Sequence, residues 1–284
     1  MASKDTLTAE DVIKNKKAAI RSVNDLLERY IATNDAGYLK KANLISYWLK
    51  SYSKYIQFEE TFVPSKNIAY KRGDIVKINF GFNIGAEYGG LHYAVVVNIT
   101  NDHSSPVVTV VPLTSQKGRS IHRYNIDLGN ELYRLLKSKH DAISQSLNSE
   151  KDSLNETATA VQDIVELAGQ VLDSIRTDES DKKKQEEKIA LVRSYLASAK
   201  KLNDDLQIKK QKNKEAIEDL RKIDAEISKM KSGSIALVSQ ITTVSKIKIM
   251  DPKNSHGILF GIRLNEESMD KINKKMKELF IFQE

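Results

Sequence analysis

Two stretches decide the fold: Arg72-Gly-Asp-Ile-Val-Lys-Ile-Asn-Phe80 and Gly85-Ala-Glu-Tyr-Gly-Gly-Leu-His-Tyr-Ala-Val-Val-Val97. Apolar side chains alternate or cluster in each, as in short strands, and a glycine-rich turn connects them. Four further runs have the same character: Val107–Thr114, Tyr124–Leu128, Ser234–Ile241 and Ile258–Leu264. Several short strands with glycine-rich turns favour a small barrel over a parallel α/β sheet.

The first 62 residues lack this pattern and predict two or three amphipathic helices. Thr8 is placed to cap the first helix, Asn34 begins a break, and apolar residues at helical spacing resume over Leu39–Phe58. In that second helix we expect Trp48 and Tyr52 to be core residues rather than a base-stacking surface. Such helices need a covering surface, from the neighbouring domain or from a second subunit.

Residues 130–232 predict a long helical hairpin. This region has no proline and one glycine, Gly169, and apolar residues recur every three or four positions from Val192 to Met230. A matching seam of seven-residue repeats precedes it. The polar run Arg176–Lys184 separates two arms of similar length, so an antiparallel coiled coil is expected, with the lysines 182–184 at a solvated tip. The region carries 20 basic and 20 acidic side chains, so the net charge of +7 lies elsewhere.

Composition excludes several classes of protein. The 284 residues include no cysteine, which excludes disulfide scaffolds, thiolate zinc sites and a cysteine nucleophile. No signal-like apolar core begins the chain, and no run approaches the roughly 18 apolar residues of a membrane span. The five histidines show no metal-ligand spacing, and neither a phosphate loop nor a G-x-S-x-G motif occurs. We therefore expect a cytoplasmic protein with no membrane segment, no metal and no cofactor.

The glycine-rich block, together with three later motifs, resembles the PemK/MazF family of toxin endoribonucleases. The block is similar to that family's R-G-D-[IV] strand and to its G-x-E-x-G-G loop, which runs into a valine-rich strand. Val110–Gln116 is similar to the next family strand, Ser234–Lys246 to a later strand, and Leu264–Ile272 to the last helix, which begins after Asn265. The resemblance covers about 67–128 and 233–282.

The resemblance implies an α+β chain in three parts. Residues 63–129 and 233–284 would form a split domain, a small SH3-like (MazF-like) β-barrel with a C-terminal helix. Residues 1–62 would be an N-terminal helical extension, and residues 130–232 an inserted long antiparallel α-helical coiled-coil hairpin. The implied function is that of a sequence-selective endoribonuclease toxin, an mRNA interferase. It would cleave single-stranded RNA without a metal, be held inactive by an antitoxin protein, and form a homodimer.

The resemblance also implies which residues carry the chemistry. In the family an Arg follows the G-x-E-x-G-G loop and a Thr ends the next strand. The Thr corresponds to Thr114, whereas His92 occupies the position of the Arg and Tyr93 that of the Pro that follows it. His92, Thr114 and Glu87 are therefore the candidate catalytic residues. The candidate RNA-binding residues are Arg72, Ser115, Gln116, Lys117 and Arg119.

Metal-free RNA cleavage uses the ribose 2′-OH as nucleophile. It needs a base, an acid and groups that stabilise the charge on the phosphorane. His92 can act as base, acid or cation, Thr114 offers a hydroxyl, and Glu87 is a complementary proton carrier. Each has a simpler interpretation: His92 as a packed side chain, Thr114 as an ordinary strand-end residue, and Glu87 as an acceptor for backbone N–H groups of its loop.

Two other functions stay open at this stage. A barrel that has lost the family Arg could bind RNA or protein without cutting, and the hairpin could be the main element of a scaffold protein. Because the hairpin is neutral, we predict that it contacts a protein rather than RNA, such as an antitoxin, a sensor or a second subunit. A passive spacer is the alternative.

Overall fold

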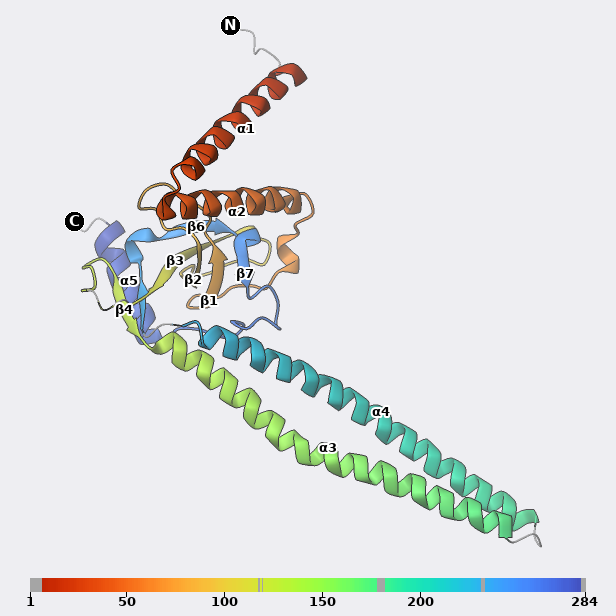
Figure 1. Cartoon of the computed structure of the whole chain (residues 1–284). Coiled ribbons are helices and arrows are strands. Elements are labelled where there is room, and N and C mark those ends of the chain that lie inside the picture. The colour runs from red at the N-terminus through yellow and green to blue at the C-terminus, as the bar shows by residue number, and fades with distance from the viewer. Residues whose placement is uncertain (1–6, 117, 119, 178–181, 231–232, 282–284) are drawn as a thin grey trace. The chain divides into compact units, whose positions relative to one another are not determined.

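The structure, a computed structural model, describes residues 7–116, 118, 120–177, 182–230 and 233–281. These residues form a mixed α+β structure with five α-helices and seven strands (Figure 1). The chain divides into two compact units. The first consists of Met1–Leu113 and Leu237–Ser255, and the second of Thr114–Ala236 and His256–Glu284.

Two helices begin the first unit. At the start of α1 (Ala9–Ala32) the predicted cap is confirmed: the Thr8 hydroxyl accepts a hydrogen bond from the Asp11 N–H, and the Asp11 carboxylate accepts one from the Thr8 N–H. Asn34 takes a positive φ of 50° at the predicted break, and Asp35 caps α2 (Ala36–Glu59). The N-terminal region thus contains two helices in its described part.

These helices bury little in the described part of the chain. No side chain of α1 is buried, and in α2 only Ala42 is. Tyr52 is 50% exposed, so the expectation that it belongs to a core is wrong, while Trp48 is half-buried. α2 contacts the sheet through its aromatic side chains, and the hydroxyl of Tyr55 accepts a hydrogen bond from the Asn79 amide at 2.9 Å.

The strands form a seven-stranded sheet, of which the first unit contains five antiparallel strands in the order β6–β3–β2–β1–β7. Their bounds are Thr242–Ser245 (β6), Val107–Ser115 (β3), Leu91–Val96 (β2), Ile75–Asn79 (β1) and Ile249–Asp251 (β7). The core lies on one face of this sheet and contains Tyr70, Val76, Ile78, Phe80, Ala94, Val96, Val108, Val110, Val244 and Ile249. Every second side chain of a strand points to the same face of the sheet, so the core takes alternate residues of β1 and β2.

The two edge strands of this sheet are consecutive in the chain. A single 3₁₀ turn, η3 (Lys246–Lys248), joins β6 to β7. Among the described residues no strand pairing links β6 to β7. The sheet is therefore open, and a closed barrel, as the sequence predicts, is not seen in its hydrogen bonding.

Two predicted strands are wrong. Ser234–Ile241 is not one strand, because β5 ends at Ala236 and a 3₁₀ turn, η2 (Val238–Gln240), follows, in which the Gln240 N–H donates to the Leu237 carbonyl at 2.9 Å. Residues 258–261 form turns and Arg263 makes only an isolated bridge, so no strand forms over 258–264. There the ammonium group of Lys139 donates hydrogen bonds to the carbonyls of residues 257, 258 and 260 at 2.8–3.2 Å, which occupies acceptors that a strand ladder would use.

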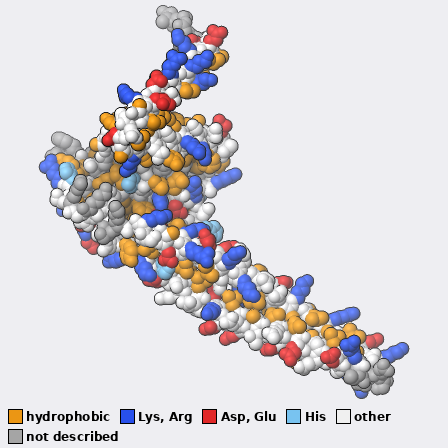
Figure 2. Space-filling view, in the orientation of Figure 1, with side chains coloured by type: hydrophobic (Ala, Val, Ile, Leu, Met, Phe, Trp, Pro, Cys, Tyr) orange, Lys and Arg blue, Asp and Glu red, His pale blue; other side chains and the backbone are white. Residues whose placement is uncertain are grey.

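The second unit contains the hairpin, and the predicted antiparallel arrangement is confirmed. It leaves after β4 (Ile126–Gly129), which pairs with β5 (Ser234–Ala236). Helices α3 (Glu131–Thr177) and α4 (Lys182–Ile227) have 47 and 46 residues, about 70 Å each at 1.5 Å per residue. The buried residues include the predicted seam positions Ala168, Val192, Ala199, Leu206 and Ile223. Basic and acidic side chains are interspersed along the hairpin (Figure 2).

A buried carboxylate at the start of α3 caps the last helix, α5 (Glu266–Phe280). Glu131 is 5% exposed. Its oxygens accept hydrogen bonds from the Asn265 N–H at 2.7 Å and from the Ser268 hydroxyl. This contact ties the root of the hairpin to the N-terminus of α5, where backbone N–H groups favour a negative charge.

No helix in the described part of the chain is both long and apolar enough to cross a membrane.

Candidate functional site

The loop between β1 and β2 is held by its own hydrogen bonds. Gly81 and Gly90 adopt positive φ values of 93° and 90°. The Phe80 N–H donates to the Gly90 carbonyl at 2.8 Å, and the Gly90 N–H donates to the Gly81 carbonyl at 2.7 Å. Within the loop, the Asn83 amide donates to the Tyr88 carbonyl at 2.7 Å. The glycine-rich motif therefore builds a defined turn that fixes the residues on either side of it.

His92 lies in β2 at the end next to this loop. It pairs with Ile78 of β1 and shares the core-facing side of the sheet with Ala94. The His92 ring is half-buried and lies 4.6 Å from the ring of Tyr88, centroid to centroid. Tyr88 is in turn fixed, because its hydroxyl donates to the Leu113 carbonyl at 2.7 Å. His92 thus stands at the edge of the core, in contact with an anchored aromatic ring.

Glu87 lies at the exposed tip of the same loop. Its carboxylate accepts a hydrogen bond from the Ile84 N–H at 3.4 Å, and its own N–H donates to the Ile84 carbonyl at 3.2 Å. These contacts match the simpler interpretation, in which Glu87 stabilises the loop. They leave a catalytic role untested.

Arg72 lies at the other end of the β1–β2 pair. Its guanidinium donates to the carbonyl of Val97, the residue that follows β2, whereas His92 is at the opposite end of that strand. The structure therefore does not bring Arg72 together with His92. Its position follows from the antiparallel pairing, which the sequence motif alone does not give.

Thr114, Ser115 and Gln116 follow one another at the end of β3, in the second unit, and all three are half-buried. The Gln116 N–H donates to the Gly233 carbonyl at 3.1 Å. Lys117 and Arg119 lie outside the described residues. The grouping of these five residues with His92 in one site stays a prediction.

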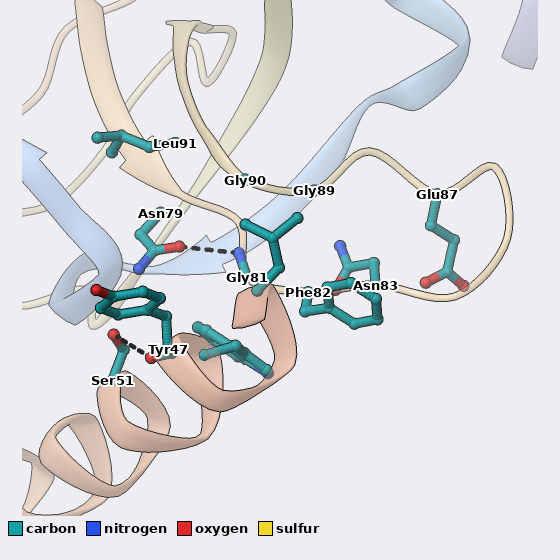
Figure 3. Close-up of a pocket in the computed structure, with 12 residues that line it drawn as sticks. Tyr47, Ser51, Asn79, Gly81, Phe82, Asn83, Glu87, Gly89, Gly90 and Leu91 are labelled. Atoms are coloured by element: carbon teal, nitrogen blue, oxygen red, sulfur yellow. Dashed lines mark hydrogen bonds between the residues drawn. The ribbon is translucent and has the colours of Figure 1, made fainter. Parts of the chain in front are cut away.

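A cavity of about 370 Å³ lies between α2 and the β1–β2 loop. Tyr47 and Ser51 of α2 lie near Asn79, whereas Glu87 is at the outer end of the loop (Figure 3). The lining also includes Trp48, and a Cβ built on Gly81 would come within 2.7 Å of its ring. The motifs in the sequence do not indicate this site. The signal available was the composition of α2, which interleaves aromatic residues with lysines.

Two lysines of η3 lie close to aromatic rings. Lys246 is 1% exposed, donates to the Asp102 carbonyl at 3.0 Å, and lies 5.8 Å from the centre of the Tyr70 ring. Burial lowers the pKa of Lys246 and also that of Lys248, which lies 5.4 Å from the Trp48 ring. Burial raises the pKa of Tyr70, whose hydroxyl donates to the Pro252 carbonyl. Lys246 is the last residue of the family-like motif Ser234–Lys246, and its burial and its hydrogen bond to Asp102 give it a role in holding the fold together.

Among the described residues, no three His, Asp or Glu side chains cluster so as to hold a metal ion.

A model of a known protein family matches part of the chain. Residues 71–151 match the family model of the PemK-like, MazF-like toxins of type II toxin-antitoxin systems. The match begins just before β1 and ends inside α3, so it contains His92, Thr114 and the loop between β1 and β2. The later motifs, at 234–246 and 264–272, lie beyond the matched residues. No curated protein matches the chain.

Proposed function

We propose that this chain, which carries a PemK-like, MazF-like toxin domain at residues 71–151, is a sequence-selective endoribonuclease toxin that cleaves single-stranded mRNA without a metal ion. The family match carries the proposal. It is supported by the position of His92, a side chain able to transfer protons, which lies in β2 against the anchored ring of Tyr88 at the place of the family Arg.

The proposed reaction is an internal transfer at the RNA backbone. The ribose 2′-oxygen attacks the adjacent phosphorus and loses its proton to a base, while the bond from phosphorus to the 5′-oxygen breaks and that oxygen gains a proton. The products are a 2′,3′-cyclic phosphate and a 5′-hydroxyl. His92 is the proposed base or acid, Glu87 the complementary carrier, and the Thr114 hydroxyl a donor to a non-bridging oxygen.

The RNA-binding residues proposed with them are Ser115, Gln116, Lys117 and Arg119, with Arg72 at the far end of the β1–β2 pair. The basic excess supports an RNA substrate, because all of the +7 net charge lies outside the neutral residues 130–232. Lysine and arginine side chains bind phosphates and release counterions. Polyanion binding therefore belongs to the globular part of the chain.

The remaining expectations belong to the same proposal. A type II toxin has an antitoxin as partner, and we propose that this chain has one, that it forms a homodimer, and that it acts in the cytoplasm. We also propose an SH3-like barrel, in the three-part division given above, with residues 63–129 and 233–284 as its two segments. The short turn η3, which connects the two edge strands, supports that fold.

RNA cleavage in EDTA by the folded, antitoxin-free chain tests the proposal. We expect cuts at a short preferred sequence, 5′-hydroxyl and cyclic phosphate ends, and no cut at a site whose 2′-OH is replaced by hydrogen. Cleavage that needs a divalent metal or tolerates the 2′-deoxy site would contradict the mechanism. Binding without cleavage would favour a non-catalytic RNA-binding module, and neither binding nor cleavage would favour a coiled-coil scaffold.

A further inference from the structure

The cavity between α2 and the β1–β2 loop has aromatic and apolar walls that are open to solvent. Tyr47 is 64% exposed and Leu91 is 52% exposed, and both line the cavity together with Phe82. A large apolar side chain that is exposed at the rim of a cavity has few packing contacts within the protein. It can therefore stack on a planar ligand without breaking such contacts. Such walls suit an aromatic ring system.

Glycines make the other wall. Gly81, Gly89 and Gly90 line the cavity, and a Cβ built on Gly89 would lie 2.8 Å from the Gly81 carbonyl oxygen. The absence of side chains lets the loop backbone pack closely on itself and on Trp48, so backbone atoms make this wall. The side chains of Ser51, Asn83 and Glu87 supply further hydrogen-bonding atoms at the lining. A ligand with both a planar face and polar edges fits this combination.

The charges around the cavity favour an anionic chain. α2 contains four lysines, at 40, 41, 50 and 54, and one acidic residue, Glu59 at its last position. Lys40 and Lys41 line an adjoining cavity that shares Phe82 with the first. Lysines interleaved with exposed aromatic residues are typical of surfaces that bind single-stranded nucleic acid, where bases stack and phosphates pair with cations. Both faces of a base inside a duplex are already stacked on neighbouring bases, so these aromatic side chains could stack only on a base of a single strand.

We propose that α2 and the β1–β2 loop form a nucleobase subsite for single-stranded RNA, with Tyr47 as the stacking residue and Lys40 and Lys41 as phosphate contacts. The inference rests on the proposed function, because it extends the substrate surface beyond residues 71–151. Asn79 and Leu91 pair on the sheet face opposite to that of Ile78 and His92. The subsite therefore lies on the sheet face opposite to His92, so the base that it holds is not the one at the scissile phosphate.

Binding of a non-cleavable RNA tests this subsite apart from catalysis. The probe is a set of single-stranded 12-mers with 2′-O-methyl riboses, each of one base type. Trp48 is the single tryptophan of the chain and lines the cavity, so we expect saturable quenching of its fluorescence as RNA binds. We expect Tyr47→Ala to weaken binding about tenfold, the scale of one lost base–aromatic stack, and Tyr47→Phe to restore it.

Two matched variants separate stacking from charge. Tyr52→Ala removes another exposed tyrosine of α2 that does not line the cavity, and we expect its affinity, measured by anisotropy, to stay within twofold of the wild type. Lys40→Gln with Lys41→Gln should lower the salt dependence of binding, whereas Tyr47→Ala should leave that slope unchanged.

The outcomes distinguish this inference from the proposed function. Quenching and a Tyr47 effect without any RNA cleavage would support the subsite and contradict the nuclease. Cleavage with equal RNA affinity in Tyr47→Ala and wild type would overturn the subsite alone, as would equal affinity for an oligomer of abasic ribose phosphates. If either pair of affinities is equal, a protein partner would be the remaining candidate for the occupant of this cavity.

Discussion

The indole ring of Trp48 lies so close to Gly81 that a Cβ on that glycine would come within 2.7 Å of it. Trp48 belongs to α2, outside residues 71–151, and Gly81 to the β1–β2 loop inside them. The glycine thus has two roles: it provides a positive φ of 93° and it gives the helix room to pack. This one contact connects the N-terminal extension to the loop that precedes His92.

Replacing Gly81 with alanine should therefore destabilise the first unit more than a comparable change nearby. We expect Gly81→Ala to lower the free energy of unfolding by about 2–4 kcal/mol, from backbone strain together with overpacking. Gly85→Ala is the control, because Gly85 also has a positive φ, of 63°, but nothing within 4 Å of its Cβ position. Its loss should be about 1–2 kcal/mol. Urea unfolding followed by Trp48 fluorescence measures both, and equal losses would contradict the steric argument.

Buried Lys246 should make stability depend on alkaline pH. Burial lowers its pKa from 10.5, so between the lowered value and 10.5 the unfolded chain binds more protons than the folded chain. The free energy of unfolding therefore rises with pH in that window. We expect the stability of the wild type relative to Lys246→Met to increase as the pH is raised toward 10.

Urea unfolding at several pH values checks the Lys246 prediction, with Lys253→Met, a change at an exposed lysine, as the control. Tyr70, whose pKa is raised by burial, is present in all three chains. A difference between wild type and Lys246→Met that does not change with pH would show that the lysine ionises equally in both states.

The sequence predicts much of the local structure because its signals are local. The cap at Thr8, the glycine turns of the β1–β2 loop, the seam of the hairpin and the cap at Asn265 each depend on residues within a few positions of one another. The strand predicted at 258–264 fails for the opposite reason. Lys139, more than a hundred positions away, donates to the carbonyls there. The spacing of apolar residues along the segment cannot predict such a long-range contact.

In the candidate site, too, the sequence predicts what depends on neighbouring residues and not what depends on long-range pairing. The motif places His92 beside its loop, and the structure adds Tyr88 as the ring against it. The motif does not indicate that Arg72 lies at the opposite end of the strand pair, since that depends on strand direction. The sequence does not indicate the cavity beside α2, since helical spacing favours Trp48 and Tyr52 as core residues rather than as a base-stacking surface. Tyr47 is exposed because the cavity that it lines opens to solvent.

Glu131 should stabilise the second unit through α5. Its two oxygens accept from the Asn265 N–H and the Ser268 hydroxyl, and a glutamine at this position retains one acceptor oxygen. We expect Glu131→Gln to lower the free energy of unfolding by about 1–3 kcal/mol, the scale of a buried group left without its partner. Glu266→Gln, a change at an exposed acid in the first turn of α5, should cost less than about 1 kcal/mol. Urea unfolding followed by helical circular dichroism compares them, and equal losses would contradict the role of Glu131.

The neutral hairpin should not supply RNA affinity. Deleting two heptads from each arm, residues 150–163 and 196–209, shortens α3 and α4 equally and keeps the period of the seam. We expect RNA affinity and its salt slope to stay unchanged and the contact with a protein partner to weaken. Replacing Lys117 and Arg119 with glutamine should instead lower the affinity and reduce the slope by about 2. Similar effects of the two changes would make the hairpin an RNA-binding element.

His92 should make cleavage depend on pH near neutrality. An arginine at this position would keep its proton, so it could serve only as a cation or hydrogen-bond donor. A histidine ordinarily titrates near pH 6.5 and can transfer protons. If His92 is the base, the rate should rise with pH between about 5 and 8. If it must be the cation, the rate should fall over the same range.

Substitutions at His92 and Thr114 separate these roles. His92→Ala should lower the rate about 100-fold or more and remove the pH dependence, since a positioned acid or base contributes on that scale. His92→Arg should restore activity only if the role is electrostatic. Thr114→Ala is the control: it should slow the reaction and leave the shape of the pH profile unchanged, because its hydroxyl does not titrate in this range. Rates are measured under single-turnover conditions, so that chemistry limits them. A fully active His92→Ala variant, or a pH-independent wild type, would move the base to Glu87 or to another residue.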